Sequence, residues 1–145
     1  MSFDTAMPFV ASYVLLKKDG KLAFVLRSNT GWMNGYYGLP SGKVEKGESY
    51  TDAAIREAKE EAGIDILAED LKFAHIMHRR EGYDWVDVFF EVTKWKGDPY
   101  NAEPHMHSEL VWLDPKALPK NTIASVKFAL DRVANREKFS EYGWN

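Results

Sequence analysis

The first third of the chain changes from short apolar runs to a dense series of turn residues. Two apolar runs rich in aromatic and β-branched residues, Phe9 to Leu16 and Leu22 to Arg27, flank a segment that contains Asp19-Gly20. Asp-Gly between two such runs is typical of a hairpin turn, so the pattern predicts an opening β-hairpin. From Ser28 to Gly42, Gly, Asn and Pro are too frequent for a long regular element, and we expect a long loop.

Two later segments have the composition or the period of helices. Glu48 to Ala62 consists largely of good helix formers and ends before Gly63, a typical C-cap, with Ser49 or Thr51 as the expected N-cap. After Pro119, apolar residues at near-helical spacing predict a second amphipathic helix from Thr122 to about Arg136. Strands are expected over Leu71 to Met77, Trp85 to Thr93 and Leu110 to Leu113.

The order of these elements indicates the fold class. Strands dominate, and the two helices are far apart in the chain, which favours an α+β fold of packed layers over a doubly wound parallel sheet. Neither an internal repeat nor a linker rich in Pro, Gly or Ser divides the sequence. We therefore expect one domain over residues 1–145.

Composition narrows the classes of function. The chain is 45% apolar, has no Cys and carries a net charge of −3. The first two features argue against a membrane span, a disulfide framework and a thiolate metal site, and with no secretory signal at the N-terminus they lead us to expect a cytoplasmic protein. Without a basic stripe, binding to a nucleic acid polymer is not expected. Carboxylates remain as the obvious metal ligands, and they favour Mg²⁺.

The first predicted helix carries an unusual stripe of acidic residues. At about 100° per residue, Glu60 lies about 60° to one side of Glu57 and Glu61 lies about 40° to the other. Like charges so close repel one another unless a cation joins them. A solvated helix face with i,i+4 ion pairs is the ordinary interpretation of such a run, and the wider pattern around it decides against that interpretation.

That wider pattern places nine residues at set spacing along the chain. They are Gly42, Glu48, Arg56, Glu57, Ala58, Glu60, Glu61, Gly63 and Ile64. With average residue usage, chance would produce this match in a chain of this length on the order of 10⁻⁷ of the time. The pattern resembles the signature of the Nudix hydrolase family, with Ser41 standing where many members have a second Gly.

The resemblance implies a fold and a reaction. The family fold is an α/β/α sandwich with a mixed β-sheet between helices. The implied reaction is Mg²⁺-dependent attack of water on a phosphoanhydride of a nucleoside di- or triphosphate or a related nucleoside diphosphate derivative, with Mn²⁺ as an alternative metal. The alternative function is a Nudix-fold binding or regulatory module without catalysis. Such a module is expected to have lost carboxylates of the motif, whereas this sequence keeps all of them.

Residue roles follow from the same resemblance. It implies Glu57, Glu60 and Glu61 as metal ligands, the Ser41 carbonyl as a backbone ligand, and Glu57 or Glu60 as the general base. Arg56 is expected to orient the catalytic groups by pairing with Glu48 or a neighbouring Glu. Gly42 and Gly63 are expected to permit tight turns.

One more carboxylate is expected from outside this motif. The segment from Trp95 to Glu103 resembles the corresponding segment of nucleoside-triphosphate-cleaving members and makes Glu103 the candidate, with Glu109 as the alternate. His105 and His107 are expected to be loop residues rather than ligands.

Candidates for substrate binding are Arg27, Tyr37 and Trp85, because a cation can meet phosphate oxygens and aromatic faces stack on bases. Arg79 and Arg80 are expected in solvent. The expected partner is a small nucleotide, and binding to a nucleic acid polymer or to a membrane is not expected. The sequence leaves the oligomeric state open, and a homodimer is compatible with it.

Overall fold

The computed structural model describes residues 4–145, and the predicted hairpin opens the described chain. The strands are β1 (Phe9–Lys18), β2 (Lys21–Arg27), β3 (Tyr37–Gly38), β4 (Ser41–Lys43), β5 (Lys72–Glu81), β6 (Tyr83–Val92), β7 (His107–Leu113) and β8 (Phe139–Tyr142). The helices are α1 (Tyr50–Ala62), the single 3-10 turn η1 (Ala68–Asp70) and α2 (Ala124–Ala134). In this part of the chain, no helix has the length and apolar character needed to cross a membrane.

The strands form a mixed sheet centred on β1. Their order is β3-β2-β1-β6-β5-β8, with β4 also paired to β1 and β7 to β2. The β1–β6 and β5–β8 pairs are parallel, whereas the other pairs are antiparallel. The structure therefore confirms the mixed sheet.

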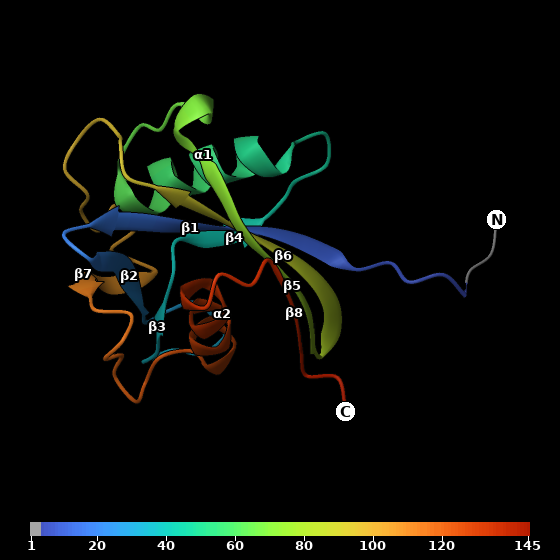
Figure 1. Ribbon diagram of the computed structural model, residues 1–145. Coiled ribbons are helices and arrows are strands. Elements are labelled where there is room, and N and C mark those ends of the chain that lie inside the picture. The colour runs from blue at the N-terminus through green and yellow to red at the C-terminus, as the bar shows by residue number, and fades with distance from the viewer. Residues whose placement is uncertain (1–3) are drawn as a thin grey trace.

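The two helices cover opposite faces of this sheet (Figure 1). Side chains alternate across a strand, so Val14 and Leu16 of β1 pack with the alanines of α1, whereas Leu15 packs with Val126 and Leu130 of α2. The result is an α/β/α sandwich with a separate apolar core on each side of the sheet.

Local signals set both ends of α1. The Ser49 hydroxyl accepts a hydrogen bond from the Asp52 amide at 3.0 Å, which makes Ser49, rather than Thr51, the N-cap. Gly63 adopts a left-handed conformation with φ 68° and donates its amide to the Lys59 carbonyl at 3.0 Å, as its C-cap role predicts. The acidic stripe therefore lies on a helix with defined ends.

The C-terminal strand β8 was not predicted from the sequence. It pairs in parallel with β5, and the fully buried His75 ties the two together. The Nδ1–H of His75 donates to the Glu137 carbonyl, and its Nε2 accepts from the Ser140 hydroxyl, both at 2.7 Å. Because both ring nitrogens of His75 are hydrogen-bonded, this side chain holds the segment that follows α2 against the sheet.

The expectation that Arg79 is solvated is wrong. Its side chain is 6% exposed and makes two hydrogen bonds to the buried Asp87, at 2.7 and 3.2 Å, and one to Glu81 at 3.0 Å. Arg80, the next residue on β5, is exposed as expected. Alternation along the strand separates the two arginines, and the buried partner of Arg79 comes from the neighbouring strand β6.

This difference predicts unequal effects of two neighbouring substitutions. Arg79→Ala leaves the Asp87 carboxylate buried and unpaired, so we expect the free energy of unfolding to fall by about 3–5 kcal/mol. Arg80→Ala removes an exposed side chain with a 4.0 Å ion pair to Asp84 and a cation–π contact with Trp144, and we expect a change below about 1 kcal/mol. Urea denaturation of both variants tests this, and equal losses would contradict the buried pair.

Candidate functional site

The acidic stripe of α1 faces strand β4. Gly42 lies directly against the Glu57 carboxylate, which a Cβ at position 42 would overlap. The backbone amide of Ser41 donates a hydrogen bond to Glu61 Oε2 at 2.8 Å. The missing side chain at position 42 therefore lets the carboxylates of the helix approach the strand backbone closely.

Arg56 joins the helix to the loop that precedes it. Its guanidinium makes a two-pronged contact with Glu48, at 2.7 and 2.9 Å, and donates to the Lys43 carbonyl at 3.1 Å. It also donates to Glu57 at 2.8 Å and to Glu60 at 3.3 Å. The hydrogen bonds from Arg56 lower the pKa of Glu48 to about 2. The pairing expected from the sequence is present, and it orients two of the three stripe carboxylates.

Three carboxylates of this region, those of Glu57, Glu61 and Glu103, lie in an environment that disfavours their charge. Glu61 is 5% exposed, and burial raises its pKa well above the ordinary value, with the charge of Glu57 adding to the effect. Burial also raises the pKa of Glu57 and of Glu103, in the second case helped by the charge of Glu60. Binding of a proton or a metal cation would relieve the unfavourable charge of these carboxylates.

The structure distinguishes the two outside candidates. One ligand atom each from Glu61, Glu103 and His107 lie within 4.8 Å of one another. Glu109 is exposed, and its carboxylate accepts a hydrogen bond from the Tyr37 hydroxyl at 2.9 Å. Glu103 therefore lies beside the helix carboxylates, whereas Glu109 is held by Tyr37.

His107, like His105, was expected to be a loop residue, but it lies in a strand. It begins β7 and is 3% exposed, with Nε2 3.7 Å from Glu61 Oε1. Burial, together with the positive charges of Arg27 and His105, lowers its pKa to about 4, so the ring is neutral at neutral pH. The pairing of β7 with β2 brings it here, and the sequence carries no local signal for that approach.

The donor set fits a divalent cation. Within residues 4–145, Glu61 receives a backbone hydrogen bond from Ser41, and no Lys or Arg nitrogen approaches its carboxylate within 4.0 Å. Carboxylate and carbonyl oxygens are the donors that Mg²⁺ prefers, and a bound cation would remove the cost of the buried charge.

The three predicted substrate residues have separate surroundings. Arg27 donates to the Trp32 carbonyl at 3.0 Å, and its guanidinium lies 5.3 Å from the centre of the Trp32 ring. Trp85 packs beside the cationic groups of Lys43 and Arg79, and its buried Nε1 has no hydrogen-bond partner in the described chain. Tyr37 donates a hydrogen bond from its hydroxyl to Glu109. Among the residues described, the side chains of Arg27, Tyr37 and Trp85 each contact different neighbours.

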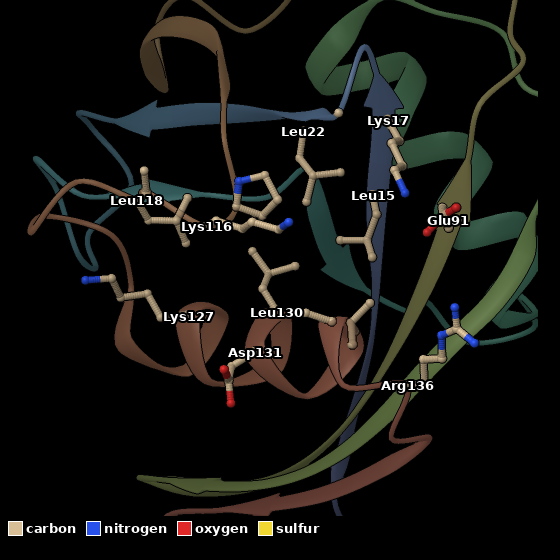
Figure 2. A pocket seen from close by; sticks show the side chains of 15 residues that line it. Leu15, Lys17, Leu22, Glu91, Lys116, Leu118, Lys127, Leu130, Asp131 and Arg136 are labelled. Carbon is tan, nitrogen blue, oxygen red and sulfur yellow. The ribbon is translucent and has the colours of Figure 1, made fainter.

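A cavity of about 970 Å³ lies elsewhere, between α2 and the β1–β2 hairpin (Figure 2). Leu15, Leu22 and Leu130 point toward one another in it, and Lys116 reaches over them. It contains none of the predicted site residues. The candidate site is thus the carboxylate cluster between α1 and β4.

Comparison with known proteins points to one family. A family model described as the NUDIX domain matches residues 7–132. Over 104 residues, or 69% of the chain, the sequence is 30% identical to the Nudix hydrolase YvcI of Bacillus subtilis strain 168. That match covers 62% of YvcI, so the aligned region spans less than two thirds of this relative. The chain is also 30% identical to the 8-oxo-dGTP diphosphatase of Proteus vulgaris over 97 residues, which are 61% of this chain and 79% of the relative.

Solved structures agree with the fold. The crystal structure of a MutT NUDIX hydrolase from Burkholderia pseudomallei is similar to this chain with a TM-score of 0.79 and 27% sequence identity. The similarity covers 88% of this chain and 98% of that one. It confirms the expected α/β/α sandwich.

Gly42→Ala should disturb the site without unfolding the protein. The added methyl group displaces the Glu57 carboxylate, and we expect Mg²⁺ affinity to fall by about 10- to 100-fold, as when a supporting group is lost. Gly47→Ala is the control because a Cβ there meets no atom within 4 Å, although its φ of 83° will cost about 1 kcal/mol of stability. Calorimetric titration with Mg²⁺ tests the pair, and equal affinities would contradict the role of Gly42.

Glu61→Gln should stabilise the metal-free protein in a pH-dependent way. Protonation of Glu61 contributes stability below its unfolded pKa of about 4.5, and that stability is lost as pH rises through the higher folded pKa. Glu61→Gln has no ionisable group at this position and does not lose this stability. In EDTA, its free energy of unfolding should therefore exceed that of the wild type by an amount that grows with pH and reaches about 1–3 kcal/mol. Urea denaturation at pH 5 and pH 8 measures it. A difference that does not change with pH would show that Glu61 is not strained by its charge.

Proposed function

The chain belongs to the Nudix family, and from that premise we propose that it is a metal-dependent pyrophosphohydrolase. It cleaves a phosphoanhydride bond of a nucleoside di- or triphosphate, or of a related nucleoside diphosphate derivative, by attack of water on phosphorus. The observation that carries this proposal is the buried Glu61 carboxylate, which lies beside Glu103 and the β4 backbone without a Lys or Arg partner in the described chain. The proposed metal ligands are Glu57, Glu60, Glu61, Glu103 and the Ser41 carbonyl.

The metal is proposed to be Mg²⁺, with Mn²⁺ as the alternative, and when bound it neutralises phosphate oxygens and makes phosphorus more electrophilic. The protein's own task is to take a proton from the attacking water. We assign that task to Glu57, because its burial raises its pKa toward the range that suits a general base. Arg56 donates a hydrogen bond to one oxygen of Glu57, so it orients the base.

Substrate recognition is proposed to lie outside the carboxylate cluster. Arg27 is half-buried at the end of β2, and its positive charge interacts with Glu61, which supports a role in binding phosphate oxygens close to the metal. Tyr37 and Trp85 remain the proposed contacts for the rest of the nucleotide. The Proteus vulgaris relative, an 8-oxo-dGTP diphosphatase, supports a nucleoside triphosphate as the first substrate to examine.

A panel of nucleotides incubated with Mg²⁺ tests the proposal. We expect release of pyrophosphate, phosphate or a mononucleotide from at least one compound, and product identification shows which phosphorus is attacked. Glu57→Gln should lower kcat by about 10²- to 10⁴-fold, because the base is lost while the fold is kept.

Two carboxylates outside the motif form a matched pair for the same assay. Glu103→Gln should lower Mg²⁺-dependent turnover at least about tenfold, whereas Glu109→Gln should keep the dependence on Mg²⁺. If the folded protein turned over no compound, the proposal would be wrong. Binding of a nucleotide without cleavage would instead indicate a binding or regulatory module.

A further inference from the structure

The turn between Glu103 and β7 holds two side chains against the acidic helix. The amide of His107 donates to the Glu103 carbonyl at 2.9 Å. The side chain of Asn101 donates to the His107 carbonyl at 2.8 Å and accepts from the Glu103 amide at 3.3 Å. One asparagine therefore fixes the backbone of both residues, and their side chains are placed together by a short, hydrogen-bonded turn.

The imidazole of His107 has unused bonding capacity. Its side chain is 4% exposed, and Nδ1 is buried with no hydrogen-bond partner in the described part of the protein. Its Nε2 points to Glu61 Oε1, but at 3.7 Å the two atoms are too far apart for a hydrogen bond. A buried polar ring without partners is rare in folded proteins and calls for an explanation.

Metal coordination would give the Nε2 atom, which faces Glu61, a bonding partner. One ligand atom each from Glu61, Glu103 and His107 lie within 4.8 Å of one another. Two ligands bound to one ion at about 2.1 Å are at most about 4.2 Å apart, so small side-chain movements can bring all three to the same cation. The set is then two carboxylate oxygens and one imidazole nitrogen.

We propose that His107 supplies a nitrogen ligand to the metal site, and that this nitrogen increases the preference of the site for borderline transition metals such as Co²⁺, Fe²⁺ or Zn²⁺ over Mg²⁺. The inference rests on the proposed function for the carboxylates and adds the nitrogen donor and the metal preference. An all-oxygen set suits Mg²⁺, whereas imidazole favours later divalent metals, whose affinities for such sites rise along the first row.

Cobalt provides a direct probe of the nitrogen. In the full-length protein loaded with one equivalent of Co²⁺, coordination through Nε2 leaves a proton on Nδ1. Proton NMR should then show one strongly shifted signal that disappears in D₂O. The signal should be missing in His107→Gln and present in His105→Gln, which changes an exposed histidine two residues away.

Affinity gives a second measurement. By calorimetry, His107→Gln should weaken Co²⁺ binding at least about tenfold and change Mg²⁺ binding less than about threefold, because only the nitrogen donor is removed. His105→Gln should change neither. Equal losses for the two metals would overturn the inference.

The wild-type spectrum decides the question even if His107→Gln does not fold. A stoichiometric Co²⁺ complex of the wild type without the shifted signal would overturn the proposed ligand. Mg²⁺-dependent hydrolysis in such a protein would leave the proposed function intact. A shifted signal in a protein that hydrolyses no nucleotide would support His107 as a ligand and contradict the proposed function.

Discussion

Burial of the Glu61 carboxylate beside Glu57 is the constraint on which the site depends. Two like charges in a poorly hydrated place repel each other, and burial alone disfavours the ionised form. The surrounding fold makes this arrangement possible: caps at both ends define α1, and the absence of a side chain at Gly42 lets the helix carboxylates reach β4. The Ser41 amide then supplies one hydrogen bond, and that is too little to balance a buried charge. The structure is therefore complete only with a proton or a cation at this position.

Positive charge is distributed unevenly across the acidic stripe. Arg56 contacts Glu48, Glu57 and Glu60, so one guanidinium orients these three carboxylates and balances part of their charge. On the other side, Glu61 faces Glu103 and a neutral histidine, and among the residues described no Lys or Arg forms an ion pair with either acid. Arg56 thus holds two carboxylates of the stripe, whereas Glu61 has no cationic partner among the residues described.

Local sequence signals were sufficient for the parts of the fold that depend on neighbouring residues. The hairpin, α1 with its glycine cap, α2 and the acidic stripe all follow from patterns within a few turns of chain. Strand β8, the buried Arg79–Asp87 pair and the approach of His107 to Glu61 did not follow, because each depends on which strands pair and in which register. The choice of Glu103 over Glu109 is of the same kind. Both acids stand near β7 in sequence, and only the three-dimensional structure shows that one meets the helix and the other meets Tyr37.

This division separates two properties of the site. The proposed metal ligands come mainly from one helix, with the Ser41 carbonyl from the adjoining strand, and both belong to the motif or border it. The donor that departs from an all-oxygen set comes from the turn over residues 101–107, outside that motif and held by Asn101. A substitution at position 103 or 107 of this turn can therefore change the donor atoms while the carboxylates of α1 are kept. The proposed substrate residues Arg27, Tyr37 and Trp85 lie outside the carboxylate cluster, and each packs against different neighbours. The motif around α1 therefore identifies the family, whereas the residues proposed to select the metal and the nucleotide lie on segments that only the fold brings to it.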